Sequence, residues 1–186
     1  MTGPIRPSTL DAILEAAFAT LSQSPSASIA DIAARAGVGR ATLHRHFPAR
    51  SDLVRALTLK AIEETDAAAE AAEAGATSHG EALRLILEAI IPLGDRYGFL
   101  STTIVDDDPE IAAHLARQSQ ETQDLIEAAK AEGSLDPNAP TDWVVQVYDH
   151  LIFAGWESIR AREATPSQAA LLAWRTFTLG LGVKRP

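Results

Sequence analysis

Apolar residues recur at helical spacing along most of this 186-residue chain, and no segment shows the strict alternation of a half-buried β-strand. The clearest run contains Leu10, Leu14, Phe18 and Leu21, which share one face of a helix. The pattern predicts an all-α fold of about nine helices. We expect the main helices near residues 8–22, 29–36, 40–46, 51–73 (capped by Ser51), 83–91, 109–132, 141–162 and 166–183.

Composition narrows the classes of protein to which the chain can belong. Hydrophobic residues make up 46% of it and charged residues 22%, which is enough apolar surface to exclude a disordered chain. The absence of cysteine excludes a disulfide-stapled module and Cys-ligated zinc or iron–sulfur sites. Because no uncharged apolar stretch reaches about 18 residues and no secretory signal opens the chain, we expect a cytoplasmic protein without membrane contact.

Charge is distributed unevenly between the two ends of the chain. Residues 1–60 hold seven basic and four acidic side chains, whereas the remainder holds nine basic and 21 acidic side chains. The overall formal charge of −9 argues against a nucleic-acid partner, but the basic excess of the first segment reverses that argument locally.

The strongest local motif spans residues 29–47, IADIAARAGVGRATLHRHF. Ala33 provides a small residue where one short helix packs on the next, Gly37 permits a sharp turn, and Leu43 anchors the second helix. Further apolar positions that face inward are Ile32, Ala36 and Val38. The outward side of the second helix then carries Arg40, Ala41, His44 and Arg45. A helix with such a face is suited to the DNA major groove.

These residues resemble the tetracycline-repressor (TetR) family of bacterial transcriptional regulators. The resemblance is carried by the apolar first helix and by Ser28–Val38, Leu43, His46–Phe47 and Arg50–Leu53. It implies a three-helix DNA-binding domain at residues 1–50, followed by a connecting helix and a helical ligand-binding and dimerisation domain at residues 51–186.

The resemblance also implies roles for individual residues. Arg40, Ala41 and Arg45 correspond to positions that meet bases, and Thr42 and His44 to positions that touch bases or backbone. Ser28 and Arg50 correspond to phosphate contacts. Gly39 departs from the family pattern because it replaces the usual Ser or Thr cap of the recognition helix, at a cost of a few tenths of a kcal/mol.

The last two predicted helices are apolar nearly all round. In residues 141–162 the polar side chains form one narrow stripe, and residues 166–183 have a similar composition. Such helices must be buried on more than one side, which favours a homodimer formed through a four-helix bundle. Two paired reading helices match a palindromic DNA operator.

Polar and aromatic residues of the second segment are candidates for a small-molecule pocket, because such pockets combine apolar walls with a few polar groups. These candidates are Tyr97, Phe99, His114, Gln146, His150, Phe153 and Trp156. The histidine spacing does not fit a metal site, and no cofactor is expected.

The sequence contains no motif of an enzyme: no GxSxG, HExxH or glycine-rich phosphate loop is present. The predicted function is that of a ligand-responsive regulator, most simply a repressor, which binds an operator as a dimer and is released by an unknown small molecule. Two alternatives are a ligand-independent DNA-binding protein and a helical module that binds another protein.

Overall fold

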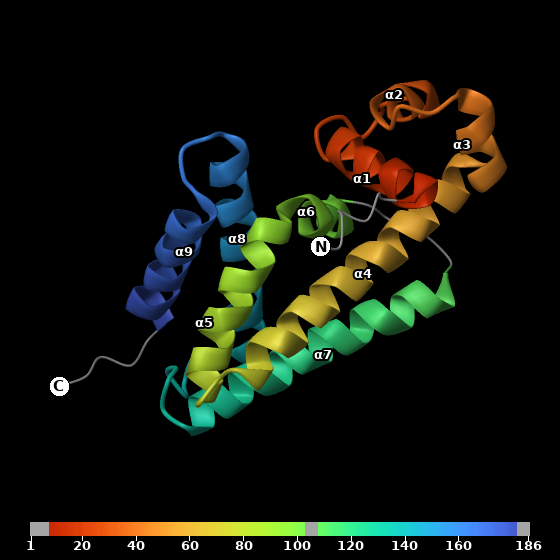
Figure 1. Cartoon of the computed structure of the whole chain (residues 1–186). Helices are drawn as coiled ribbons and strands as arrows, with labels where there is room; N and C mark the ends of the chain where they lie inside the picture. The colour runs from red at the N-terminus through yellow and green to blue at the C-terminus, as the bar shows by residue number, and fades with distance from the viewer. Residues whose placement is uncertain (1–7, 103–107, 182–186) are drawn as a thin grey trace, which may run out of the picture.

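A computed structural model describes residues 8–102 and 108–181, and these residues form nine α-helices and one short 3₁₀ helix (Figure 1). The all-α prediction is confirmed. The helices are α1 (Thr9–Leu21), α2 (Ile29–Arg35), α3 (Arg40–His46), α4 (Arg50–Ala74), α5 (His79–Ile90), η1 (Ile91–Leu93), α6 (Gly94–Thr102), α7 (Pro109–Ala131), α8 (Thr141–Arg160) and α9 (Pro166–Leu181).

Two helix starts differ from expectation. Helix α4 begins at Arg50 rather than after Ser51, because the Asp52 carboxylate accepts a hydrogen bond from the backbone N–H of Ala49 (2.9 Å) and closes the helix end two residues earlier. Helix α5 begins at His79, where the Ser78 hydroxyl accepts a hydrogen bond from the N–H of Glu81.

Helices α1, α2 and α3 form a small body at one end of the molecule (Figure 1). Its core is an apolar cluster that includes Ile13, Phe18, Ile32, Leu43 and Leu53. The first two helices each begin with a reciprocal pair of Ser and Asp side chains, at Ser8 and Asp11 and again at Ser28 and Asp31.

Helix α4 extends from this small body into a larger one that is formed by α5 to α9 (Figure 1). At 1.5 Å per residue its 25 residues span about 37 Å. Its first half contributes Leu57 and Ala61 to the core of the small body, and Ala68 packs against the core of the larger one. The predicted boundary at residues 50 and 51 therefore falls at the start of a helix that both bodies share.

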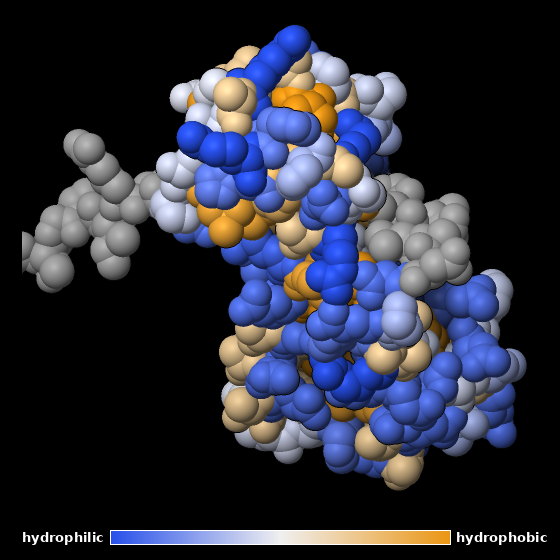
Figure 2. Space-filling model, turned by 90° about the vertical axis from the view of Figure 1, so that its right-hand side faces the viewer, coloured by the Kyte–Doolittle hydropathy of each residue, from blue (hydrophilic) through white to orange (hydrophobic). Residues whose placement is uncertain are grey.

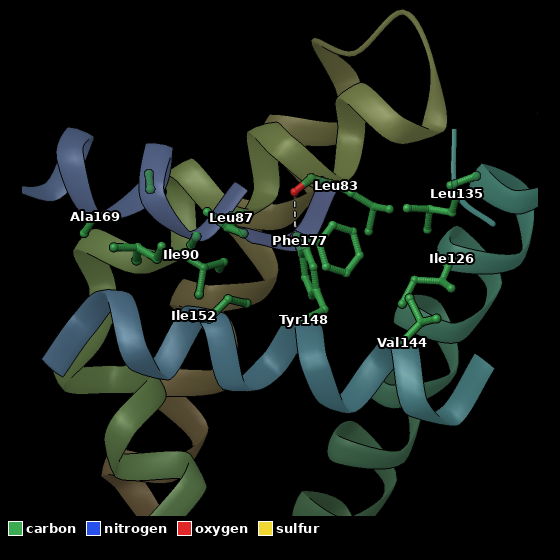
Figure 3. Close-up of a cluster of buried hydrophobic side chains, with 14 residues drawn as sticks. Leu83, Leu87, Ile90, Ile126, Leu135, Val144, Tyr148, Ile152, Ala169 and Phe177 are labelled. Atoms are coloured by element: carbon green, nitrogen blue, oxygen red, sulfur yellow. Dashed lines mark hydrogen bonds between the residues drawn. The ribbon is translucent and has the colours of Figure 1, made fainter. Parts of the chain in front are cut away.

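The core of the larger body lies between α5, α7, α8 and α9 (Figure 3). Phe177 is fully buried and packs edge-on against Tyr148, with 5.4 Å between the ring centroids. The Tyr148 hydroxyl donates a hydrogen bond to the backbone carbonyl of Leu83 at 2.6 Å, which satisfies the one polar group of this cluster (Figure 3). No helix in the described ranges is long and apolar enough to cross a membrane.

Candidate nucleic-acid interface and ligand cavity

The turn between α2 and α3 depends on a glycine. Gly37 has a φ of +67°, a region that side chains with a Cβ rarely adopt. Beyond it, the N–H of Val38 donates a hydrogen bond to the carbonyl of Ala33 (3.0 Å), which closes the end of α2. Ile32, Ala33 and Leu43 are buried, so the predicted inward face of the motif packs as expected.

The opposite face of α3 is open to solvent. Arg40, Ala41, His44 and Arg45 are exposed, whereas Thr42 is half-buried and its hydroxyl oxygen accepts a weak hydrogen bond from Arg45 at 3.5 Å. The side of the molecule that carries α3 and α7 is predominantly hydrophilic, with apolar residues in scattered patches (Figure 2). Helix α3 therefore presents two guanidinium groups and an imidazole on one accessible surface.

Ser28 stands exposed at the start of α2, where its hydroxyl is held in a local pair. The hydroxyl donates to the Asp31 carboxylate at 2.7 Å and accepts from the Asp31 N–H at 3.2 Å. The hydrogen bond from the Ser28 hydroxyl, followed by that from its backbone N–H, lowers the pKa of Asp31 below its ordinary value. Asp31 therefore stays ionised and fixes the first turn of α2.

Arg50 has a partner that sequence reasoning missed. Its guanidinium donates hydrogen bonds to the backbone carbonyls of Pro25 (2.7 Å) and Ala27 (2.6 Å), in the loop before α2. These contacts fix the loop against the start of α4. Arg50 is exposed and lies close to Ser28, the other residue for which a phosphate contact is expected.

Five helices, α4 to α8, line a cavity of about 490 Å³. Its apolar walls come mainly from α5, α7 and α8, with Leu100 from α6. Its acidic side chains come from α4, α7 and α8. The lining residues are Thr65, Asp66, Ala69, Glu70, Glu73, Leu83, Ile86, Ile90, Leu100, Leu115, Gln118, Ser119, Glu121, Thr122, Leu125, Val145, Tyr148, Asp149 and Ile152.

The structure places the predicted pocket residues elsewhere, apart from Tyr97, which lies in α6 with its side chain outside the described part of the molecule. Gln146 and His150 are exposed on α8, and His150 Nδ1 lies 2.7 Å from the Gln146 carbonyl oxygen within that helix. His114 lies on α7, one position before a lining residue. Its Nδ1 is buried without a hydrogen-bond partner in the described residues.

The aromatic candidates pack in the cores rather than in the cavity lining. Phe99 is buried against Phe18 of α1, edge-on with 5.7 Å between centroids. Trp156 is buried beside α6 and packs edge-on with Phe153 at 5.3 Å. Aromatic side chains bury much apolar area, so packing contacts satisfy them without a ligand.

Helix α6 packs closely on α8 and also contacts α1 of the small body. A Cβ at Gly94 would overlap the Trp156 indole, and one at Gly98 would lie 2.7 Å from its Cη2 atom. These two glycines therefore let α6 approach α8 closely. Because Leu100 of α6 also lines the cavity, a molecule bound there would touch this helix directly.

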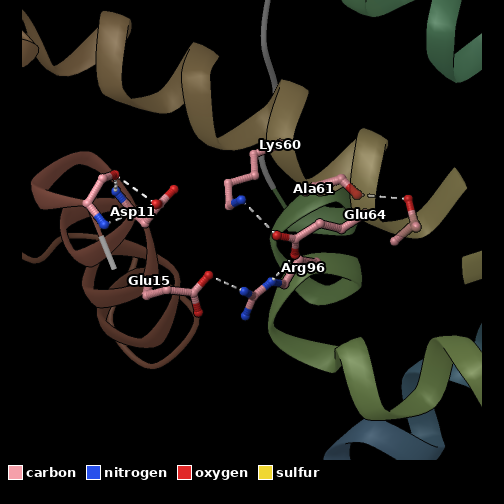
Figure 4. Close-up of polar contacts among 8 residues, drawn as sticks. Asp11, Glu15, Lys60, Ala61, Glu64 and Arg96 are labelled. Atoms are coloured by element: carbon pink, nitrogen blue, oxygen red, sulfur yellow. Dashed lines mark hydrogen bonds and ion pairs between the residues drawn. The ribbon is translucent and has the colours of Figure 1, made fainter. Parts of the chain in front are cut away.

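Arg96 connects α6 to α1 of the small body and to α4 (Figure 4). Its guanidinium forms a short ion pair with Glu15 of α1, donates to Glu64 of α4 at 2.7 Å, and lies 4.6 Å from the ring centroid of Phe18. Burial raises the pKa of Glu64, but hydrogen bonds from Lys60 and Arg96 outweigh it, so the pKa is lowered. One half-buried cation thus ties three helices together.

The described residues contain no group of His, Asp and Glu side chains that could hold a metal ion. Two candidate functional sites are present among these residues instead. One is the basic exposed face of α3. The other is the cavity in the larger body, joined to α1 through α6 and Arg96.

Comparison with known proteins identifies the family of the chain. Residues 13–57 match the tetR family of bacterial regulatory proteins. The chain is 35% identical, over 157 residues, to the HTH-type transcriptional repressor LfrR of Mycolicibacterium smegmatis (strain ATCC 700084 / mc(2)155), and the match covers 83% of this chain and 81% of that protein.

Two crystal structures of LfrR from Mycobacterium smegmatis share the fold. One has a TM-score of 0.65 at 30% identity and covers 92% of this chain and 99% of its own. The other, in complex with proflavine, has a TM-score of 0.74 at 32% identity and covers 94% and 97%. The chain therefore belongs to the tetR family of bacterial regulatory proteins, which are transcriptional regulators and not enzymes.

Proposed function

We propose that this protein represses transcription as a homodimer, which holds a palindromic operator through two copies of α3 and releases it when a small molecule enters the cavity. The observation that carries the proposal is the combination, in one chain, of an exposed basic α3 and a cavity lined by α4 and α6, two helices that both contact α1. The similarity to LfrR supports repression in preference to activation.

The reading surface consists of Arg40, Ala41, Thr42, His44 and Arg45 on α3. An exposed arginine on a helix in the major groove can donate two hydrogen bonds to a guanine edge, which discriminates against other bases by about 1–3 kcal/mol. We assign phosphate contacts to Ser28 and Arg50, which are exposed at the starts of α2 and α4. Phosphate contacts set the orientation of the protein without reading sequence.

Exposed apolar residues on α8 and α9 support the dimer. Leu171 and Leu172 are each 56% exposed, Leu179 is 80% exposed, and Trp143 on α8 is 59% exposed. Leu172 and Leu179 are seven residues apart, so they lie on one stripe along α9, and Leu171 lies about 100° further around the helix. Because α8 and α9 also pack against each other, a second copy of the same pair would cover this surface in a four-helix bundle.

The cavity supports regulation by a small molecule. Its volume of about 490 Å³ and its mixture of apolar walls and polar groups are typical of ligand sites. LfrR forms a complex with proflavine, so proflavine is the first compound to test on this chain. A ligand that binds one spacing of the two α3 helices more tightly than another shifts the protein toward that spacing.

Footprinting on the DNA that flanks the protein's own gene tests the proposal. We expect a palindromic footprint that weakens steeply with salt and disappears when proflavine or another ligand is added. A footprint that no ligand affects would support the ligand-independent alternative. The absence of any sequence-specific footprint would favour a module that binds another protein.

A further inference from the structure

The cavity offers hydrogen-bond acceptors and negative charge. Most hydrogen-bond donors of its polar side chains are already paired with acceptors of the protein. Five of its lining residues are carboxylates, and none of the lining residues described is Lys, Arg or His. From this distribution we infer that the ligand of the cavity is an organic cation with an apolar body. The inference rests on the proposed function, because it concerns the effector of the same site.

The carboxylates come from three helices that face the cavity. Asp66, Glu70 and Glu73 follow one another at intervals of four and three residues along α4, so they lie on one side of that helix. Glu121 lies on α7, and the half-buried Asp149 lies on α8. A ligand in the cavity is therefore within reach of negative charge from more than one wall.

Arg117 neutralises part of this charge from outside the lining. It pairs with Asp66 at 2.6 Å and with Glu121 at 3.5 Å. Arg117 thus contacts two of the five carboxylates, and no basic side chain stands among the described residues that line the cavity with them. In a partly water-excluded site such charge is screened less than on an open surface, and it acts on any charged ligand.

The hydroxyl and amide donors of the lining already have partners. Thr65 donates to the carbonyl of Ala61 (2.8 Å), and Thr122 donates to that of Gln118 (3.0 Å). Tyr148 donates to Leu83, as described above. The amide of Gln118 donates to Thr65 and also to Asp66, so the exposed Ser119 is left as the accessible hydroxyl donor among the described lining residues.

An anionic ligand would therefore meet repulsion and lack donors, whereas a cation would find acceptors on several sides. The apolar residues of α5, α7 and α8 take the body of such a ligand, since burying its surface contributes about 25 cal/mol per Å². The expected ligand class is a hydrophobic amine or a ring system with delocalised positive charge.

Two compounds of nearly the same shape and opposite charge test this inference. Tetraphenylphosphonium and tetraphenylborate differ chiefly in the sign of their charge, and calorimetric titration into the full chain without DNA measures both. We expect tetraphenylphosphonium to bind at least about tenfold more tightly, with affinity that falls as salt rises. Proflavine serves as a second, planar cation.

Neutralising variants assign the effect to the cavity. Asp149→Asn is expected to weaken binding of tetraphenylphosphonium by about three- to tenfold, and Glu70→Gln, at an exposed position of α4, by about two- to threefold. Asp142→Asn is the matched control, because it removes the same charge from an exposed position of α8 that does not line the cavity. The affinity of the Asp142→Asn protein for tetraphenylphosphonium should equal that of the unaltered protein.

Equal or tighter binding of tetraphenylborate would overturn the inference, as would failure of both cations to bind or affinities that the Asp149 and Glu70 variants leave unchanged. These titrations contain no DNA, so they are independent of repression. If the protein binds cations but no operator, the proposed function fails and the ligand class stands. If an anion releases the operator, only the ligand class fails.

Discussion

Arg40, Arg45 and Arg50 are all exposed, but they differ in the contacts that they make. Arg40 and Arg45 project from α3 with no ion pair in the described structure, whereas the guanidinium of Arg50 is occupied by the carbonyls of Pro25 and Ala27. Removal of Arg50 therefore affects the loop before α2 as well as any phosphate contact. Removal of Arg40 or Arg45 breaks no ion pair of the described structure, and Arg45 gives up only its weak hydrogen bond to Thr42.

Replacement of Arg40 or Arg45 by Ala tests the reading surface. Each change should weaken operator binding by about 1–3 kcal/mol and relax the preference at particular bases. Competition binding with single-base operator variants measures both effects. Arg84→Ala is the control, since Arg84 pairs with Glu81 and Glu88 within α5. If both α3 variants kept full specificity, the assignment of the reading face would be wrong.

The outward face of α3 could be predicted because its determinants are local. Gly37, Leu43 and the spacing between them fix the turn and the inward face, so the outward residues follow from helical periodicity. The bonds of Arg50 could not be predicted, since the carbonyls of Pro25 and Ala27 precede it by more than 20 residues and carry no side-chain signal.

The residues that line the cavity could not be predicted for a similar reason. Asp66 and Asp149 lie 83 positions apart and approach one space only through the packing of α4, α7 and α8. Aromatic residues such as Phe99 and Trp156 were expected in a pocket, but the structure uses them to pack helices. The acidic side of α4, with residues four and three apart, was the one signal in the sequence that pointed to the cavity.

At the scale of elements, α6 connects the cavity with the small body that carries α3. Arg96→Met removes its ties to Glu15 and Glu64 but keeps an apolar side chain of similar length. We expect operator binding to persist, whereas the ligand-induced loss of operator affinity should shrink about fivefold or more, because coupling energies are typically about 1–3 kcal/mol. Operator binding measured by anisotropy, with and without ligand, checks this.

Arg84→Met provides the comparison for this variant, because the ion pairs of Arg84 stay within α5. Its response to ligand should equal that of the unaltered protein. An Arg96→Met protein with a full response to ligand would show that coupling follows another route.

The start of α5 and the end of α7 are joined by one carboxylate. Glu132 accepts hydrogen bonds from the Ser134 hydroxyl and from the backbone N–H groups of Gly80 and His79. These bonds, of which that from Ser134 has the largest effect, lower the pKa of Glu132 to about 2. Because the folded-state pKa is lowered, the stabilisation is present above the unfolded pKa near 4.5 and is lost as pH falls toward 2.

Glu132→Gln should therefore lower the free energy of unfolding at pH 7 by about 1–2 kcal/mol, less than the pKa shift alone gives because solvent reaches the side chain. The difference between the two proteins should narrow as pH falls from 5 to 3. Urea unfolding at several pH values measures it. A difference independent of pH would contradict the role assigned to this carboxylate.

At the scale of the whole molecule, the exposed stripe of α9 should decide the oligomeric state. Leu172→Lys and Leu179→Lys place charges where a second copy would pack. Each should convert the dimer to a monomer and weaken operator binding by more than about tenfold, because one reading helix contacts only half of a palindrome. Sedimentation and operator titration check the two effects together.

Gln168→Lys is the matched control, since Gln168 is exposed on α9 beside its N-terminus and its side chain bonds Thr165. It should stay dimeric. A wild-type protein that is monomeric at concentrations where it binds its operator would contradict the assembly.

In the proposed mechanism, the dimer holds two α3 helices at a distance that a cavity ligand changes. The chain has no cysteine, so Ala34→Cys gives one spin label per protomer on the exposed side of α2. Double electron–electron resonance spectroscopy should give one main distance between the two spin labels, compatible with reading helices about 34 Å apart in the operator complex. Proflavine or tetraphenylphosphonium should shift that distance. No dipolar signal, or one that no ligand shifts while the operator is released, would contradict the account.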